Sequence, residues 1–308
     1  MIKAVFIVGP TASGKTSLSI ELAKHFGGEI ISADSMQIYK GIHIASAAPD
    51  ESEKQGIPHH LIEFLNLTEQ FSVAEYVKLA REKIYEISSH GKLPIIVGGT
   101  GLYISSLIDN IEFIEQDVDI DLRNELEQKF DELGAENILQ ELATFDSESA
   151  SRLHPNNRRR IIRAFEVYLQ TGKTITEQNI ISKQNKSDIS PIIFGLNFAN
   201  RQNLYDRINL RVDLMVENGL LNEAETTFKK RDNKGAFQAI GHKELYPYFT
   251  GELTLLQAIE NLKMQTRRYA KRQITWFKRI EDINWYYPDI QNPIEDMLSL
   301  TKEFLKEE

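Results

Sequence analysis

Short runs of consecutive apolar residues alternate with longer amphipathic stretches along the first hundred positions of the chain. The apolar runs at 3–8, 29–33 and 93–97 have the length and composition of buried strands. Residues 17–26 and 72–89 have the apolar spacing of helices. An alternation of buried strands and amphipathic helices is typical of α/β proteins with a doubly wound, mainly parallel sheet, which is the fold that we predict.

The pattern changes after residue 110. From there to residue 189 no run has the character of a buried strand, and we predict helices at 122–133, 135–144 and 158–171. Strand character resumes at 191–196, and helices leading to a polar tail are predicted at 201–217, 220–231 and 255–280. These patterns predict a core with C-terminal helices, made of 1–110 and 190–308, and an inserted α-helical domain at 111–189.

The first predicted strand is followed at once by a match to the pattern G-x-x-x-x-G-K-[ST], and a helix comes next. The glycines let the backbone approach an anion closely, so that successive N–H groups and the positive end of the helix point at one phosphate group. The lysine adds a mobile positive charge, and the final hydroxyl is placed to contact Mg²⁺. We therefore predict a P-loop core that binds a di- or triphosphate, with Thr16 as the metal ligand, through Gly9, Pro10, Thr11, Ala12, Ser13, Gly14, Lys15 and Thr16.

Composition restricts the class of protein. The chain has no cysteine, which excludes disulfides and thiolate metal sites. It has no run of about 18 apolar residues, so we predict a cytoplasmic protein without a membrane segment. The formal net charge of −9 argues against an extended, nonspecific coat of nucleic acid, but leaves room for a local basic surface.

Positive charge is concentrated in two predicted helices. One opens with Arg158, Arg159 and Arg160, and the other carries seven Lys and Arg residues between 263 and 279 with no acid among them. A solvated charged face is the ordinary interpretation of such a segment. Here the excess of one sign within an acidic chain, next to aromatic residues, favours contact with RNA or polyphosphate.

Two polar residues follow predicted strands, at the edge of the sheet where such folds bind ligands. Asp34 either caps a helix that begins at Ser35 or accepts a proton from a substrate held beside the phosphates. Thr100 lies in a Gly-Gly-Thr-Gly turn. Its hydroxyl either reaches a phosphate oxygen or forms a hydrogen bond within that turn. No acid follows the strand at 93–97, which argues against a motor-type ATPase.

Three strings in the chain are highly specific: D-S-M-Q at 34–37, G-G-T-G-L-Y at 98–103 and A-K-R-Q-x-T-W at 270–276. Together with the phosphate loop and in the same order, they resemble the tRNA dimethylallyltransferase family. The resemblance implies transfer of a dimethylallyl group from dimethylallyl diphosphate to N6 of the adenosine 3′-adjacent to the anticodon in tRNA, with Mg²⁺. It also implies that the inserted helices contact the anticodon stem. We expect the protein to act as a monomer.

The same resemblance implies roles for individual residues. Asp34 would accept the proton of the adenine amino group. Lys15, Thr16 with magnesium, and Thr100 would stabilise the departing diphosphate, and Arg207 or Arg211 would add positive charge. Contact with tRNA is expected for Asp34, Ser35, Met36, Gln37, Thr100, Arg123, Asn157, Arg158, Arg159, Arg160, Ile161, Ile240, Gly241, His242, Lys243, Glu244, Arg267 and Arg272.

The chain departs from the family pattern at three places. Many bacterial members have G-T-A-K-P where residues 45–49 read A-S-A-A-P, so a lysine is missing. His242 replaces a frequent tyrosine, and Arg158 adds a cation ahead of the usual Arg pair.

Two other functions stay open. An ATP-dependent small-molecule P-loop kinase explains residues 1–110 equally well but leaves the basic helices without a role. The third possibility is an RNA-binding module controlled by a nucleotide, without chemistry.

Overall fold

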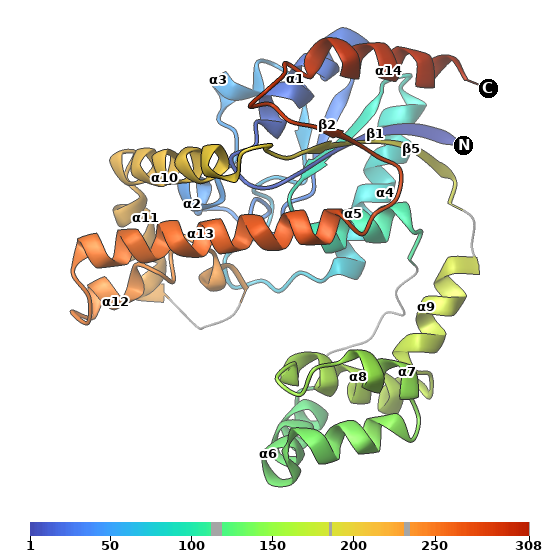
Figure 1. Ribbon diagram of the computed structural model, residues 1–308, viewed down its shortest axis with the longest axis vertical. Helices are drawn as coiled ribbons and strands as arrows, with labels where there is room; N and C mark the ends of the chain where they lie inside the picture. The colour runs from blue at the N-terminus through green and yellow to red at the C-terminus, as the bar shows by residue number, and fades with distance from the viewer. Residues whose placement is uncertain (112–118, 185–186, 231–234, 308) are drawn as a thin grey trace. The chain divides into compact units, whose positions relative to one another are not determined.

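The computed structural model describes residues 1–111, 119–184, 187–230 and 235–307 (Figure 1). A six-stranded sheet forms the core of its larger unit, residues 1–108 and 188–308. Every pairing between its strands is parallel, and the strand order is β3-β2-β4-β1-β5-β6. The predicted mainly parallel α/β fold is therefore confirmed. The strands are β1 (Ile2–Val8), β2 (Glu29–Ser32), β3 (His59–His60), β4 (Pro94–Gly98), β5 (Ile189–Leu196) and β6 (Ile283–Tyr286).

Helices cover both faces of this sheet because alternate side chains of each strand point to opposite sides. Val5 and Ile7 of β1 join a buried cluster with Leu22 of α1 and Met297 of α14, whereas α4 packs on the sheet with α5 beside it. The helices of this unit are α1 (Lys15–Phe26), α2 (His43–Ser46), α3 (Glu51–Lys54), α4 (Val73–Ser89), α5 (Gly101–Ile108), α10 (Arg201–Glu217), α11 (Leu220–Lys230), α12 (Tyr246–Phe249), α13 (Leu255–Phe277) and α14 (Ile294–Lys306), with a 3₁₀ turn at Gly235–Gln238.

The C-terminal segment differs from the prediction. Instead of a polar tail, the chain after α13 forms the edge strand β6 and the helix α14. The strand was missed because it has only four residues, of which one is buried. The helix packs Met297 and neighbouring apolar residues against the cluster that contains α1, so these last residues belong to the core of the fold.

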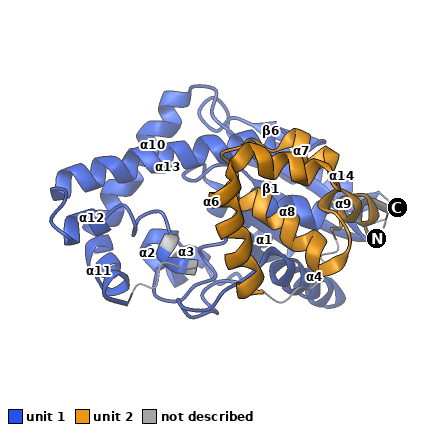
Figure 2. Ribbon diagram, turned by 90° about the horizontal axis from the view of Figure 1, so that it is seen from below, with its two compact units in different colours: residues 1–108, 188–308 blue, residues 109–187 orange. Residues whose placement is uncertain are grey.

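Residues 109–187 form a second compact unit, whose described part is helical (Figure 2). Its helix α6 is broken at Gly134, which has φ 76° and ψ 160°, and this break lies between the two helices predicted at 122–133 and 135–144. The polar composition of residues 182–188 predicts a linker, but the chain is still helical up to residue 184, and residues 185–186 lie outside the described part. The helices are α6 (Ile120–Ala143), α7 (Ser147–Arg152), α8 (Arg158–Thr171) and α9 (Ile175–Gln184).

None of the described helices combines the length and the apolar character that crossing a lipid bilayer requires.

Candidate active site

A cavity of about 320 Å³ lies at the carboxyl ends of β1, β2 and β4 in the larger unit. Thr11, Lys15 and Thr16 of the phosphate loop (residues 9–16) line it. The turn at residues 34–37, which we call the Asp34 turn, lines it as well. Two stretches far apart in the sequence therefore meet in one cavity, because parallel strands bring their carboxyl ends to the same edge of the sheet. Further lining residues come from α2, α10, α13 and the turn at residues 240–243.

Positive charge gathers on the phosphate-loop side of the cavity. The Lys15 ammonium donates to the carbonyl oxygens of Gly9 at 3.1 Å and Pro10 at 2.7 Å. Burial, with a contribution from repulsion by Arg211, lowers the pKa of Lys15 to about 7, and the attraction of Asp34 only partly opposes this. An anion in the cavity would favour the charged form of this lysine.

The two arginines predicted to assist differ in position. Arg211 of α10 lines the cavity. Arg207, one turn earlier, is exposed and donates from Nε to the carbonyl oxygen of Ala12 at 2.9 Å. Arg207 therefore supports the phosphate loop from outside, whereas Arg211 can contact a bound ligand directly.

Asp34 is the only acid among the described residues that line the cavity. Its Oδ1 accepts from the backbone N–H of Met36 at 2.9 Å, and the residues that follow form a turn. No helix begins at Ser35, so the interpretation of Asp34 as a helix cap is wrong. Thr100 is not among the described residues that line the cavity, and its hydroxyl oxygen accepts from the backbone N–H of Ser35 at 2.9 Å.

Gln37, the last residue of the Asp34 turn, fixes the part of the cavity wall that α2 forms. Its Oε1 accepts from the Ser32 hydroxyl at 2.8 Å, and its Nε2 donates to the carbonyl oxygen of Ala47 at 3.1 Å. These bonds tie the end of α2 to strand β2. Gln37 thus bonds the segment at residues 45–49, in which this chain lacks the lysine that many family members have.

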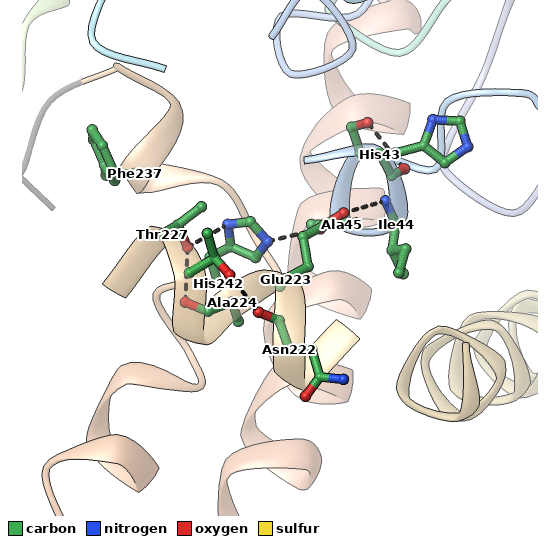
Figure 3. Close-up of polar contacts among 12 residues, drawn as sticks. His43, Ile44, Ala45, Asn222, Glu223, Ala224, Thr227, Phe237 and His242 are labelled. Atoms are coloured by element: carbon green, nitrogen blue, oxygen red, sulfur yellow. Dashed lines mark hydrogen bonds and ion pairs between the residues drawn. The ribbon is translucent and has the colours of Figure 1, made fainter. Parts of the chain in front are cut away.

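The other end of α2 is capped by a side chain from α11 (Figure 3). The preceding residue, Ile42, has no side-chain acceptor. The Glu223 carboxylate accepts from the backbone N–H groups of Ile44 at 2.8 Å and Ala45 at 2.9 Å, and from Nε2 of His242 at 2.8 Å. Burial alone would raise the pKa of Glu223, but these hydrogen bonds outweigh it and the net pKa is lowered. The carboxylate is therefore held in its charged form.

Residues 240–244 were predicted as a block of tRNA contacts, and the structure divides them. The side chain of His242 is fully buried and pairs through Nδ1 with the Thr227 hydroxyl at 3.1 Å. Glu244 is also buried and accepts from the backbone N–H of Gly241 at 2.9 Å. These two side chains shape the turn, while Ile240, Gly241 and Lys243 line the cavity. A motif in the sequence does not reveal which of its members face inward.

The basic face of α13 is divided in the same way. Lys263 forms an ion pair with Asp213 of α10 at 2.8 Å, and Arg267 donates to the Asn209 side chain at 2.5 Å. Arg272 is exposed, lines the cavity and lies over the ring of Tyr269 at 5.7 Å. Exposed cations on this helix and just after it are Arg268, Lys271, Arg272, Lys278 and Arg279.

In the helical unit, two of the predicted tRNA-binding arginines are held by acids. Arg123 forms a two-pronged pair with the buried Glu166, at 2.6 Å and 3.0 Å. Arg158 pairs with Glu127 and Asp131. The side chain of Ile161 is fully buried in the core of this unit. Of the predicted residues there, Asn157, Arg159 and Arg160 are exposed, and Arg123 is exposed as well although it is paired.

Comparison with known proteins identifies the family. The family model described as IPP transferase matches residues 37–280. A tRNA dimethylallyltransferase of Thermoanaerobacter sp. (strain X514) is 48% identical over 299 residues, which cover 96% of this chain and 95% of that protein. The chain belongs to the tRNA dimethylallyltransferase family.

Solved structures of the same family share the fold. The full-length tRNA isopentenylpyrophosphate transferase of Bacillus halodurans is 41% identical with a TM-score of 0.75, over 99% of this chain and 97% of that one. A eukaryotic dimethylallyltransferase acting on tRNA has a TM-score of 0.83 at 30% identity, over 99% of this chain and 80% of that one. A P-loop core with a helical insertion is thus the architecture of a tRNA dimethylallyltransferase.

Three residues of this site were missed by the sequence interpretation. Glu223 caps α2 from α11, and Tyr269 lines the cavity beside Thr100. Gln273 is buried and bonds to the phosphate loop. Tyr269 and Gln273 stand inside the string that carried the family resemblance, but nothing in a string shows that a side chain reaches a distant loop.

Proposed function

We propose that this protein transfers the dimethylallyl group of dimethylallyl diphosphate to N6 of the adenosine 3′-adjacent to the anticodon in tRNA, giving diphosphate. The observation that carries the proposal is the cavity in which Lys15 and Arg211 face a single carboxylate, Asp34. The cations suit the diphosphate, and the carboxylate suits a group that loses a proton. Membership of the tRNA dimethylallyltransferase family supports the choice of donor and acceptor.

The residues account for each part of the reaction. The adenine amino group is a poor nucleophile, because its lone pair is delocalised into the ring. As the bond from N6 to C1 of the dimethylallyl group forms, the C1–O bond breaks and its electron pair leaves with the diphosphate oxygen. The N6 proton passes to the Asp34 carboxylate. Lys15, Arg211 and the N–H groups of the phosphate loop stabilise the negative charge that develops on the leaving group.

The residues present also fit a magnesium ion. Mg²⁺ commonly uses one or two protein oxygens together with phosphate oxygens and waters. Thr16 lines the cavity at the start of α1, beside the position proposed for the diphosphate. Its hydroxyl would hold the ion, which when bound neutralises charge on the diphosphate.

The exposed cations are the proposed contacts with tRNA. Asn157, Arg159 and Arg160 of the helical unit would bind the anticodon stem, and Arg272 would contact the RNA near the cavity. The Asp34 turn lines the space that the extruded adenine would enter, since a base must leave its stack to react. Ser35 and Met36 are the proposed contacts there, whereas the amide of Gln37 already bonds Ser32 and Ala47.

The test is transfer of label. The purified protein is incubated with Mg²⁺, labelled dimethylallyl diphosphate and tRNA from cells that lack the modification. Label in the tRNA, together with a nucleoside mass matching N6-dimethylallyladenosine, is the expected result. A matched tRNA with guanosine in place of the target adenosine should take up no label. Phosphorylation of a metabolite by ATP would favour the kinase instead, and RNA binding without turnover would favour a binding module.

A further inference from the structure

One buried glutamine joins the phosphate loop to the turn after β4. Gln273 lies on α13 and is 5% exposed. Its Oε1 accepts from the backbone N–H of Thr11 at 2.9 Å, and its Nε2 donates to the carbonyl oxygen of Gly99 at 3.0 Å. Each end of the amide thus has its own kind of partner, so the orientation of the side chain is fixed by both loops.

The helix can approach the turn this closely because the turn is made of glycines. A Cβ on Gly99 would lie 2.1 Å from Nε2 of Gln273. A Cβ on Gly101 would lie 2.4 Å from the ring of Trp276, one turn of helix further on. The side chains of α13 therefore occupy the space that larger residues in the turn would need, and the contact is built into both segments.

A second residue of α13 extends this connection to the Asp34 turn. The side chain of Tyr269, one turn before Gln273, lies close to the side chains of Thr100 and Gln273. Burial raises the pKa of Tyr269, with the Asp34 charge adding to it, so the hydroxyl stays protonated. Thr100 in turn accepts from the backbone N–H of Ser35. Helix α13 therefore bonds Thr11 and Gly99 through Gln273, and its Tyr269 lies beside Thr100, which bonds the residue next to Asp34.

We infer that Gln273 is a positioning residue for the transfer reaction, which rests on the proposed function. It fixes the phosphate loop relative to the Asp34 turn, and hence the diphosphate relative to the carboxylate that takes the proton. A reaction between two bound groups depends steeply on their alignment, and a displacement of about 1 Å can cost on the order of 100-fold in rate. Gln273 also lines the cavity, but both ends of its amide bond protein groups, so in this role it acts through the two loops that it joins.

The test uses the full-length protein with Gln273→Met, which keeps the approximate length of the side chain and removes both hydrogen bonds. We expect kcat per active site to fall about 10- to 100-fold, while the dissociation constant for tRNA stays within about twofold of the wild type. Gln265→Met is the matched control, because Gln265 lies on the same helix and its one side-chain bond among the described residues is to Asn261 of that helix. This control should leave kcat unchanged.

A purely structural role would give a different result. It would lower the melting temperature and the fraction of active sites, with kcat per active site unchanged, and that outcome would overturn the inference. If Gln273→Met fails to fold, Tyr269→Phe, which removes one hydroxyl, should still lower kcat, and normal turnover of this variant would overturn it as well. A wild-type protein that transfers no label would refute the proposed function itself, whereas an active wild type with a fully active Gln273→Met variant would refute only this inference.

Discussion

Glu223 and Ala45 are joined by a hydrogen bond of 2.9 Å across 178 residues of sequence. With the bond to Ile44, it places a carboxylate at the N-terminus of α2, where an anion is favoured by the exposed N–H groups and the helix dipole. The short helix α2 lines the cavity but buries none of its own residues. Its position therefore depends on partners elsewhere in the chain, chiefly Glu223 and Gln37.

Replacing Glu223 by Ala should therefore destabilise the protein and widen the cavity on the side lined by α2. The change leaves two backbone N–H groups and the buried His242 without their acceptor, at a cost of roughly 1–3 kcal/mol. Urea denaturation measures the loss, and the KM for donor should rise. Glu225→Ala is the matched control, because Glu225 is half exposed on the same helix and its one ion pair within the described part of the chain is with Lys229. Equal unfolding midpoints for the two variants would show that the cap contributes nothing.

Replacing Asp34 by Asn should separate its chemical role from its structural one. Asn keeps an oxygen for the Met36 N–H, so the turn is retained, but it cannot take up a proton at neutral pH. We expect kcat to fall by about 10²–10⁴, with little change in tRNA affinity. Single-turnover rates and filter binding measure the two quantities.

Asp34→Ala, which also loses the turn, should be no more active than Asp34→Asn. If Asn at this position retained most of the turnover, Asp34 would orient the base without accepting its proton.

The sequence predicted those parts of the molecule whose signals are local. Helix α10 has the predicted bounds, 201–217, because its apolar stripe and flanking residues mark both ends. The phosphate loop was recognisable because its chemistry lies within eight consecutive residues. The roles of Gln273 and Glu223 were not recognisable, since the backbone groups that they bond lie 174 to 262 residues away in the sequence. The acids that pair with Arg123 and Arg158 could not be predicted, because an arginine looks the same in a sequence whether or not an acid neutralises it in the fold.

The low pKa of Lys15 predicts proton uptake on donor binding. Without ligand the pKa is about 7, against 10.5 for an ordinary lysine. A bound diphosphate favours the ammonium form and raises this pKa, so binding above pH 7 takes a proton from solution. Donor affinity should therefore fall as the pH rises from about 7 to 9. Titration calorimetry at pH 8 without tRNA, in two buffers of different ionisation enthalpy, measures the uptake.

Lys15→Arg provides the control, because arginine stays charged throughout this range and should take up no proton. The folding stability of the unliganded protein should change with pH in the opposite direction from the donor affinity. Between about pH 7 and 10.5 the unfolded chain binds a proton at Lys15 that the folded chain does not, so this group makes folding more favourable as pH rises. No difference in proton uptake between wild type and Lys15→Arg would contradict the lowered pKa.

Replacing Arg123 by Ala should lower the stability of the helical unit. Glu166 is 3% exposed, and removing the two-pronged pair leaves its carboxylate with only the longer contact to Arg163 at 3.3 Å. We expect a loss of roughly 1–3 kcal/mol, measured by hydrogen exchange of α6 and α8. Because the pKa of Glu166 is lowered in the fold, the pair stabilises above about pH 4.5 and is lost on acidification.

The double variant Arg123→Ala with Glu166→Ala distinguishes structure from RNA contact. Removing both partners abolishes the unpaired buried charge and should restore much of the lost stability. If tRNA affinity returns with stability, Arg123 acts through the fold. Affinity that stays low in a stable double variant would mean that Arg123 touches the RNA.

The two arginines of α13 that were predicted together to bind tRNA should behave differently. Arg272 is exposed at the cavity, whereas Arg267 is bonded to Asn209 of α10. Each phosphate contact that is lost lowers the slope of log affinity against log salt by roughly 0.7–0.9. Arg272→Gln should therefore flatten the slope by about this amount, measured as tRNA dissociation constants between low and moderate salt. Arg267→Gln should leave the slope unchanged and lower the melting temperature instead, because its guanidinium supports the packing of α13 on α10. Equal slopes for Arg272→Gln and the wild type would mean that Arg272 faces solvent in the complex, and that the RNA is held by other cations of the chain.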